Sequence, residues 1–135
     1  MTLVEVVIAL AISSLMVGGI IAGYNFCTQA SVKAELTQAA NAKALERLEQ
    51  TRSAIWAPDR SDPIDQLVST NFPSLSVTLD MPGSGSNGTL AQINTTITTL
   101  ASAPPTRSVH VDCIWQFRDA SWVTNSVETI RATDQ

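Results

Sequence analysis

The sequence has little charge, few cysteines and no early proline. Its 135 residues carry 12 acidic and 8 basic side chains, so it lacks the basic face that a direct nucleic-acid partner would require. Two cysteines, Cys27 and Cys113, are too few for a disulfide scaffold; they allow one intramolecular bridge, one intermolecular link or two free thiols. Because proline is absent before Pro58, nothing of that kind interrupts a long N-terminal helix.

Charge is almost absent from the first 32 residues, where Glu5 is the one charged side chain. Residues 6–26 read VVIALAISSLMVGGIIAGYNF, and at about 1.5 Å per residue such a helix can cross a hydrocarbon core of roughly 30 Å. A secretory signal fits poorly, because no Lys or Arg precedes the run and the run exceeds a signal core. A buried soluble helix fits poorly, because so short a chain could hardly cover it on all sides. We therefore predict that residues 1–26 form a transmembrane helix.

Glu5 is expensive in such a helix, at about 2.5–3.5 kcal/mol on insertion scales. One interpretation places it near the helix start, where it reaches the headgroups and where the first turn favours an acid. A second interpretation pairs it with the α-amine of Met1. In a stack of identical helices, Glu5 of one chain would meet the Met1 amine of the next. Such pairing offsets the desolvation of both groups and sets the axial register.

Small side chains suggest contact between helices. Gly19 and Gly23 form a GxxxG stretch, and Ser14, Gly18 and Ala22 follow at the same spacing, which lets backbones approach closely in lipid. The Gly18–Gly19 pair has a second interpretation. Glycine costs about 1 kcal/mol in a helix interior relative to alanine, so local unwinding there would be cheap.

The stretch TLVEVVIALAI, from Thr2 to Ile12, resembles the N-terminus of type IV pilins and of type II secretion pseudopilins. In that family a prepilin peptidase removes a short basic leader, the new N-terminal residue is N-methylated, and a glutamate at the fifth mature position is the hallmark. The resemblance therefore implies that Met1 is the processed and methylated residue and that Glu5 makes the assembly salt bridge. The usual proline in the middle of the apolar stretch is missing here, so any melting in a filament would fall at Gly18–Gly19.

The helical pattern continues past the apolar run as an amphipathic stalk, residues 27–57. Its apolar residues recur at three- and four-residue steps: Val32, Leu36, Ala39, Ala40, Leu45, Leu48 and Ile55. Lys43 is spaced to pair with Glu46, and Glu49 with Arg52. Pro58 is expected to end the helix, and residues 59–63 to form a loop.

Residues 58–135 are predicted to be a β-sheet head, because alternation replaces the helical period. Four strands are expected at 74–80, 92–100, 108–118 and 122–131, with a flexible loop at 81–88 and a hairpin at 118–121. The odd-numbered face would be buried. The predicted fold class is α+β: one long N-terminal helix packed against an antiparallel sheet of about four strands, which is also the ladle-like fold that the pilin resemblance implies.

Other candidate chemistry is weak. His110 and Cys113 would point to opposite faces of a strand, so they do not make a nucleophilic pair. The carboxylates of Asp59, Asp62 and Asp65 could donate oxygens to calcium, but their spacing matches no calcium loop and a solvated turn is the plainer interpretation. Asn87 and Asn94 begin glycosylation sequons, a pattern that also arises by chance. No cofactor or enzymatic activity is expected.

The sequence thus predicts a structural protein, a subunit of a bacterial type IV pilus-like filament. The subunit would be stored in the inner membrane, handled by the prepilin peptidase and the assembly machinery, and polymerised with copies of itself into a surface filament. The alternatives are a minor pilin, a pseudopilin that remains periplasmic, and a single-pass anchored binding domain that acts alone.

Overall fold

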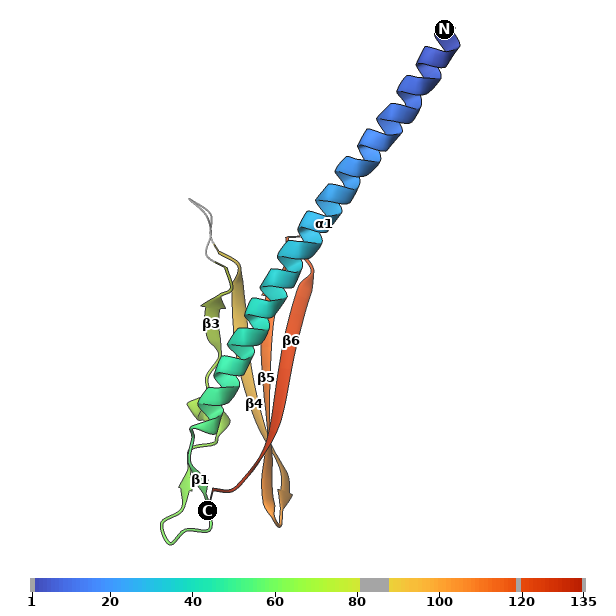
Figure 1. Ribbon diagram of the computed structural model, residues 1–135. Helices are drawn as coiled ribbons and strands as arrows, with labels where there is room; N and C mark the ends of the chain where they lie inside the picture. The colour runs from blue at the N-terminus through green and yellow to red at the C-terminus, as the bar shows by residue number, and fades with distance from the viewer. Residues whose placement is uncertain (1, 81–87, 119, 135) are drawn as a thin grey trace. The chain divides into compact units, whose positions relative to one another are not determined.

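The structure, a computed structural model, describes residues 2–80, 88–118 and 120–134 (Figure 1). The chain divides into two compact units, Met1–Glu35 and Leu36–Gln135. Helix α1, Leu3–Arg52, begins in the first unit and ends in the second. The fold class is α+β, as predicted: a long N-terminal helix and an antiparallel sheet of four strands on which its second half packs.

The stalk helix ends earlier than predicted, at Arg52 rather than residue 57. Beyond it, β1 (Trp56–Ala57) pairs with β2 (Ile64–Asp65) in a short antiparallel hairpin. The Trp56 backbone N–H also donates to Asp134 Oδ2 at 2.8 Å. The Arg131 guanidinium donates to the carbonyls of Thr51 and Ala54, at 2.8 and 2.9 Å, and so satisfies backbone acceptors at the helix end. Tertiary partners therefore overrode the helical pattern near residue 55.

The main sheet has the predicted four strands in the order β3-β4-β5-β6. They are β3 (Leu75–Thr78), β4 (Leu90–Ser102), β5 (Pro105–Gln116) and β6 (Trp122–Ala132). All neighbours are antiparallel, and a tight turn, closed by the Phe117 N–H donating to the Ser121 carbonyl at 2.9 Å, joins β5 to β6 at the predicted hairpin. β4 and β5 run longer than the alternation suggested, and the 3-10 turn η1 (Ser69–Asn71) was not predicted.

The core of the second unit lies between the sheet and the helix segment that begins at Leu36. The predicted odd face of β5 is buried, with Val109, Val111, Cys113 and Trp115 at 0% exposure. The helix contributes a narrow stripe: Leu36, Ala40, Ala44, Leu48 and Thr51. Of the predicted stripe, Leu45 and Ile55 are instead exposed, at 49% and 42%. The centre of the true stripe is formed by two small alanines, Ala40 and Ala44, which are both fully buried.

Helix and β6 run in the same direction in the second unit. The Asn125 amide donates to Asn41 Oδ1 at 3.0 Å near the start of β6, whereas Arg131 reaches Thr51 near its end. The Leu36 end of the helix therefore lies at the end of the sheet that carries the Phe117–Ser121 turn. Figure 1 shows this arrangement of α1 across β4, β5 and β6.

Candidate functional site

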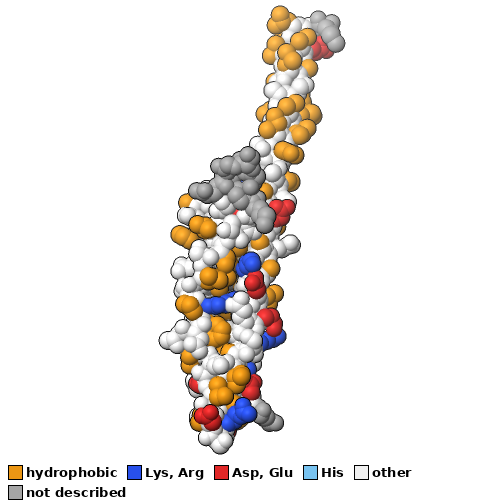
Figure 2. Space-filling view, turned by 90° about the vertical axis from the view of Figure 1, so that its left-hand side faces the viewer, with side chains coloured by type: hydrophobic (Ala, Val, Ile, Leu, Met, Phe, Trp, Pro, Cys, Tyr) orange, Lys and Arg blue, Asp and Glu red, His pale blue; other side chains and the backbone are white. Residues whose placement is uncertain are grey.

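The first half of α1 exposes apolar side chains on every side. Among the described residues of the first unit, all from Thr2 to Ser31 are exposed. An 18-residue window in α1 has a mean hydropathy of 2.4 and is 0% buried, so the helix is long and apolar enough to cross a membrane. Figure 2 shows these side chains as orange atoms along the helix. An uncovered surface of this size requires lipid or other protein around it, which makes this segment the candidate functional site.

Glu5 is the acidic member of a capping box at the start of that segment. Its backbone N–H donates to Thr2 Oγ1 at 3.4 Å, and its Oε2 accepts from the Thr2 backbone N–H at 3.0 Å. Thr2 and Glu5 therefore satisfy each other's backbone donors at the N-terminus of α1. We did not predict this contact, although the T-x-x-E spacing before an apolar run is its sequence signature.

The capping box changes how Glu5 is explained. The carboxylate has a structural task inside its own chain, in addition to any partner outside it. Both contacts with Thr2 use Oε2, at 3.0 Å to the backbone N–H and 3.5 Å to the hydroxyl, so a partner from another chain would meet Oε1. The other half of the predicted salt bridge, Met1, lies outside the described residues.

The small residues of α1 divide between two stripes. At about 100° per residue, Gly19 and Gly23 lie on the side of Glu5, whereas Ser14, Gly18 and Ala22 form a second stripe that begins on the opposite side at Ser14 and turns toward Gly19. A Cβ atom added at Gly18, Gly19 or Gly23 would meet nothing within 4 Å. The glycines are therefore not required by the packing of this chain, and α1 is helical through all three. Contact between helices and unwinding at Gly18–Gly19 remain predictions. Ser14 Oγ donates to its own helix, to the Ala11 carbonyl at 2.8 Å.

Both cysteines are free thiols in the structure. Cys27 is exposed on α1, and Cys113 is fully buried in the sheet core. Burial raises the pKa of the Cys113 thiol, because the apolar surroundings disfavour the thiolate. Cys27 and Cys113 are not bridged to each other in the structure, and an intermolecular link stays a prediction.

The acidic loop residues do not converge on a metal site. Asp65 makes a bidentate ion pair with Arg107, with both distances 2.7 Å, and the same guanidinium lies 4.5 Å from the Trp56 ring centroid. No group of three His, Cys, Asp or Glu within residues 2–80, 88–118 and 120–134 could hold a metal ion. Asp65 thus fastens β2 to β5, a role that sequence spacing could not reveal because its partner is 42 residues away.

The structure describes the asparagine of one glycosylation sequon but not that of the other. Asn87 lies outside the described residues. Asn94 is half-buried in the middle of β4, and its Oδ1 accepts a hydrogen bond from Ser74 Oγ at 2.8 Å. Glycosylation at either residue remains a prediction.

The sheet surface turned away from α1 carries a polar cluster that sequence reasoning missed. His110 Nε2 lies 2.9 Å from Asp112 Oδ1, and Ser126 Oγ donates to the same oxygen at 2.5 Å. Glu128 accepts from Ser108 Oγ. Cys113 lies on the other, buried face, as predicted. The imidazole faces carboxylates rather than a nucleophile. The hydrogen bonds from Ser126 to Asp112 and from Ser108 to Glu128 link β5 to β6.

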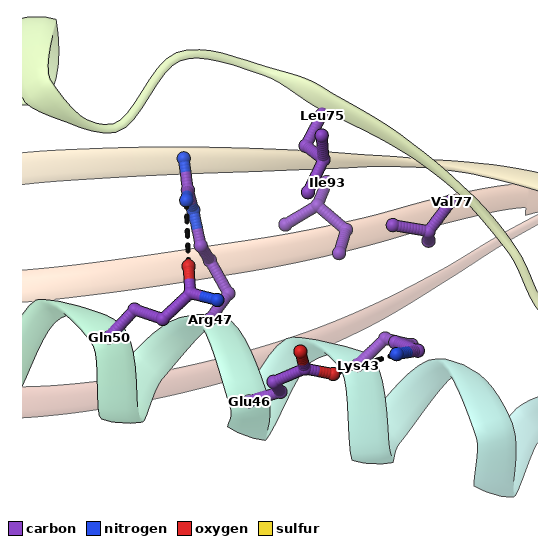
Figure 3. A pocket seen from close by; sticks show the side chains of 7 residues that line it. All are labelled: Lys43, Glu46, Arg47, Gln50, Leu75, Val77 and Ile93. Atoms are coloured by element: carbon purple, nitrogen blue, oxygen red, sulfur yellow. Dashed lines mark hydrogen bonds and ion pairs between the residues drawn. The ribbon is translucent and has the colours of Figure 1, made fainter.

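A small groove separates the stalk helix from strands β3 and β4 (Figure 3). Its floor is apolar, formed by Leu75, Val77 and Ile93, and its helix side carries Lys43, Glu46, Arg47 and Gln50. The predicted ion pairs Lys43–Glu46 and Glu49–Arg52 are confirmed at 2.7 and 2.8 Å. Polar side chains thus rim the groove, and the alkyl parts of the long helix residues partly cover its floor.

Comparisons with family models, curated proteins and solved structures found no match to this chain.

Proposed function

We propose that this protein is a structural subunit of a type IV pilus-like filament. The observation that carries the proposal is the first half of α1, which is apolar, uncovered on every side and interrupted by one carboxylate at Glu5. A helix of this kind is stable in a bilayer, and equally in the centre of a polymer where copies of the same helix replace the lipid. The resemblance of residues 2–12 to pilin N-termini favours the polymer.

In the proposed filament, Glu5 sets the axial register between neighbouring subunits. Its Oε1 meets the N-terminal amine at Met1 of the neighbouring subunit while Oε2 keeps the Thr2 cap. Burial in an apolar core makes an unpaired carboxylate costly, so subunits that align this pair are favoured over those that do not. The two stripes of small residues, one through Gly19 and one through Gly18, allow neighbouring helices to pack closely.

The same segment would act at each proposed stage: membrane anchoring, N-terminal processing and filament assembly. Before assembly the helix anchors the chain in the inner membrane. A prepilin peptidase processes the N-terminus, and an assembly machine then moves the helix from lipid into a filament on the cell surface. A minor pilin or a periplasmic pseudopilin would use the same segment in the same way.

A second candidate is a single-pass anchored domain that acts alone. The capping box favours it, because the Thr2–Glu5 contact accounts for the carboxylate without any neighbour. The two candidates differ in what they require of Glu5: the anchored domain needs its hydrogen bond, and the filament also needs its charge.

Two substitutions separate hydrogen bond from charge. Glu5→Gln keeps a side chain that completes a capping box but removes the charge. Thr2→Ala removes the cap, at a cost of about 1 kcal/mol, and keeps the charge. Filaments sheared from cells that produce each variant are quantified and imaged by cryo-electron microscopy, with the membrane fraction measured in parallel. We expect Glu5→Gln to leave the protein in the membrane and to abolish filaments, and Thr2→Ala to retain them at reduced yield.

A normal yield of filaments from Glu5→Gln would refute the pairing. Absence of any fibre from the wild type, with the protein abundant in the membrane fraction, would favour a minor subunit, a pseudopilin or the anchored domain. Mass spectrometry of the mature chain checks the processing step separately, since methylation at residue 1 is expected only within the pilin-like family.

A further inference from the structure

The sheet surface turned away from α1 has a second feature, a shallow patch near the Phe117–Ser121 turn. It is lined by Ser74, Ser76, Leu90, Gln92, Ile114 and Trp122, which we call the Trp122 patch. Trp122 and Leu90 are 70% and 64% exposed, and Trp122 is the most exposed large apolar side chain among the described residues of the second unit. Strand β5 lies between Leu90 on β4 and Trp122 on β6, and the two exposed apolar side chains line one hollow of the sheet surface. Exposed apolar side chains gathered in one place are typical of interaction sites.

Strand register explains how these residues meet. Ser76 faces Gln92, Gln92 faces Ile114, and Ile114 faces Thr124, so one row crosses all four strands. Adjacent strands lie about 4.8 Å apart, which gives the row a span of roughly 14 Å. Trp122 stands at the β6 end beside this row, and the hydroxyl and amide groups stand at the β3 and β4 end. The patch is therefore an elongated platform with an aromatic end and a hydrogen-bonding end.

The lining of the Trp122 patch is uncharged and can form hydrogen bonds, which favours a neutral, polar ligand. None of the six side chains is charged, so the patch offers nothing to a phosphate, a nucleic acid or a charged peptide. Ser76 and Gln92 are exposed, and within the described residues neither side chain has a hydrogen-bond partner. Their hydroxyl and amide groups can both donate and accept. The flat face of Trp122 presents a surface on which apolar C–H groups stack.

We propose that the Trp122 patch binds a neutral oligosaccharide. A sugar ring has an apolar C–H face that matches the indole and hydroxyl groups that match the serine and glutamine side chains. The length of the row accommodates a short chain of sugars rather than a single ring. The binding is independent of the filament proposal, because all the residues that carry it belong to the second unit.

Tryptophan fluorescence reports this site directly. Of the three tryptophans, Trp56 and Trp115 are 3% and 0% exposed, so the solvent-sensitive emission comes from Trp122. The full chain is placed in phosphatidylcholine nanodiscs, which carry no sugar headgroups, and titrated with chitotriose, maltotriose and a neutral N-acetyllactosamine oligosaccharide. Sialylated N-acetyllactosamine tests the preference for an uncharged ligand. We expect a saturable blue shift with at least one neutral oligosaccharide and weaker binding of its sialylated form.

Matched variants assign the binding to the patch. Binding to Trp122→Ala and to Gln92→Ala is followed by calorimetry, because the first variant lacks the fluorescent reporter. We expect Trp122→Ala to weaken binding about tenfold or more, as truncated aromatic anchors do. Gln92→Ala should weaken it severalfold, and Trp122→Phe should retain part of it. The control is Ile130→Ala, which removes a comparably exposed side chain, 64%, from the same face of β6 at the other end of the sheet.

Three results would overturn the proposal. The first is no saturable binding of any neutral oligosaccharide at millimolar concentration. The second is an equal loss of affinity in Ile130→Ala, which would show a nonspecific effect. The third is protection of Trp122 from a water-soluble quencher that grows with protein concentration, because that would make the patch an interface between copies of this chain.

Discussion

The two halves of α1 differ in burial: the first half leaves its side chains exposed, and the second half buries a stripe of them. From Leu3 to about residue 26 the helix is strongly apolar, and all of its side chains are exposed. From Leu36 to Arg52 it is half polar and buries a stripe one residue wide. The apolar composition of a segment indicates that it needs a partner to cover it. Burial shows whether this chain already provides that partner. The second half finds its partner in its own sheet, and the first half needs one from outside.

The halves also use small residues differently. In the second half, Ala40 and Ala44 are 0% exposed beneath the sheet, so a larger side chain there would clash. In the first half, Gly18, Gly19 and Gly23 meet nothing within 4 Å. The same residue class therefore marks a contact already made in one half and a contact still available in the other.

The largest expected contrast between the two units is in thiol reactivity. Cys27 is exposed, whereas Cys113 is buried in a core that must open before a reagent can enter, and burial raises the pKa of its thiol. With a membrane-permeant maleimide, Cys27 should react faster than Cys113 by about three orders of magnitude or more. Mass spectrometry of a labelling time course measures both rates, and denatured protein serves as the control. Equal protection of both cysteines that disappears on reduction would indicate a disulfide instead.

A buried and an exposed leucine of α1 test this difference between the halves through the free energy of unfolding. Leu48 is 4% exposed and Leu15 is 77% exposed on the same helix. Leu48→Ala should lower the free energy of unfolding of the second unit by about 2–5 kcal/mol, because it leaves a cavity between helix and sheet. Leu15→Ala should change it by less than about 0.5 kcal/mol. Urea unfolding followed by tryptophan fluorescence measures both, and similar losses in the two variants would contradict the division into units.

The smallest expected effect is a loss of stability in acid that is confined to the second unit. A hydrogen bond from Arg107 lowers the pKa of Asp65, and a hydrogen bond from the Trp56 backbone N–H lowers that of Asp134. Depressed values of this kind stabilise the fold above the unfolded pKa of about 3.9, and the contribution disappears as pH falls through the lower folded values. The free energy of unfolding of the second unit should therefore decrease at pH values below about 4, while the circular dichroism of the helix in the first unit persists.

The variant Asp65→Asn/Asp134→Asn provides the control for that experiment. It should be less stable than the wild type at neutral pH and should show a flatter dependence on pH. An unchanged acid profile in this variant would assign the effect to other carboxylates.

Sequence patterns anticipated the elements that local periodicity specifies. Alternation at Val109, Val111 and Cys113 predicted both a strand and its buried face, and the helical spacing of charges predicted the Lys43–Glu46 pair. The same reasoning extended the helix to residue 57 because Ile55 fits its stripe. It failed there because β2, Asp134 and Arg131, all distant in sequence, compete for the backbone around Trp56.

Some features of the candidate sites were likewise predictable from the sequence, and others required the tertiary structure. The apolar character of the first half of α1 and the position of Glu5 come from the sequence alone, because a run of apolar residues needs no fold to be recognised. The Thr2–Glu5 cap was also available in the sequence as a T-x-x-E pattern. The Trp122 patch was not, because Trp122, Ile114, Gln92 and Ser76 come from four strands and meet only through register.

The helix, its apolar first half, the strands and the face that each strand buries were all predictable from local spacing, since they depend on contacts within a few residues of the chain. Tertiary contacts were needed to fix where the helix ends, which stripe of it is covered, that Asp65 pairs with Arg107, and that uncharged residues of four strands line one patch. Those outcomes depend on partners many residues apart, and the spacing of residues along a chain carries no record of which distant segments become neighbours.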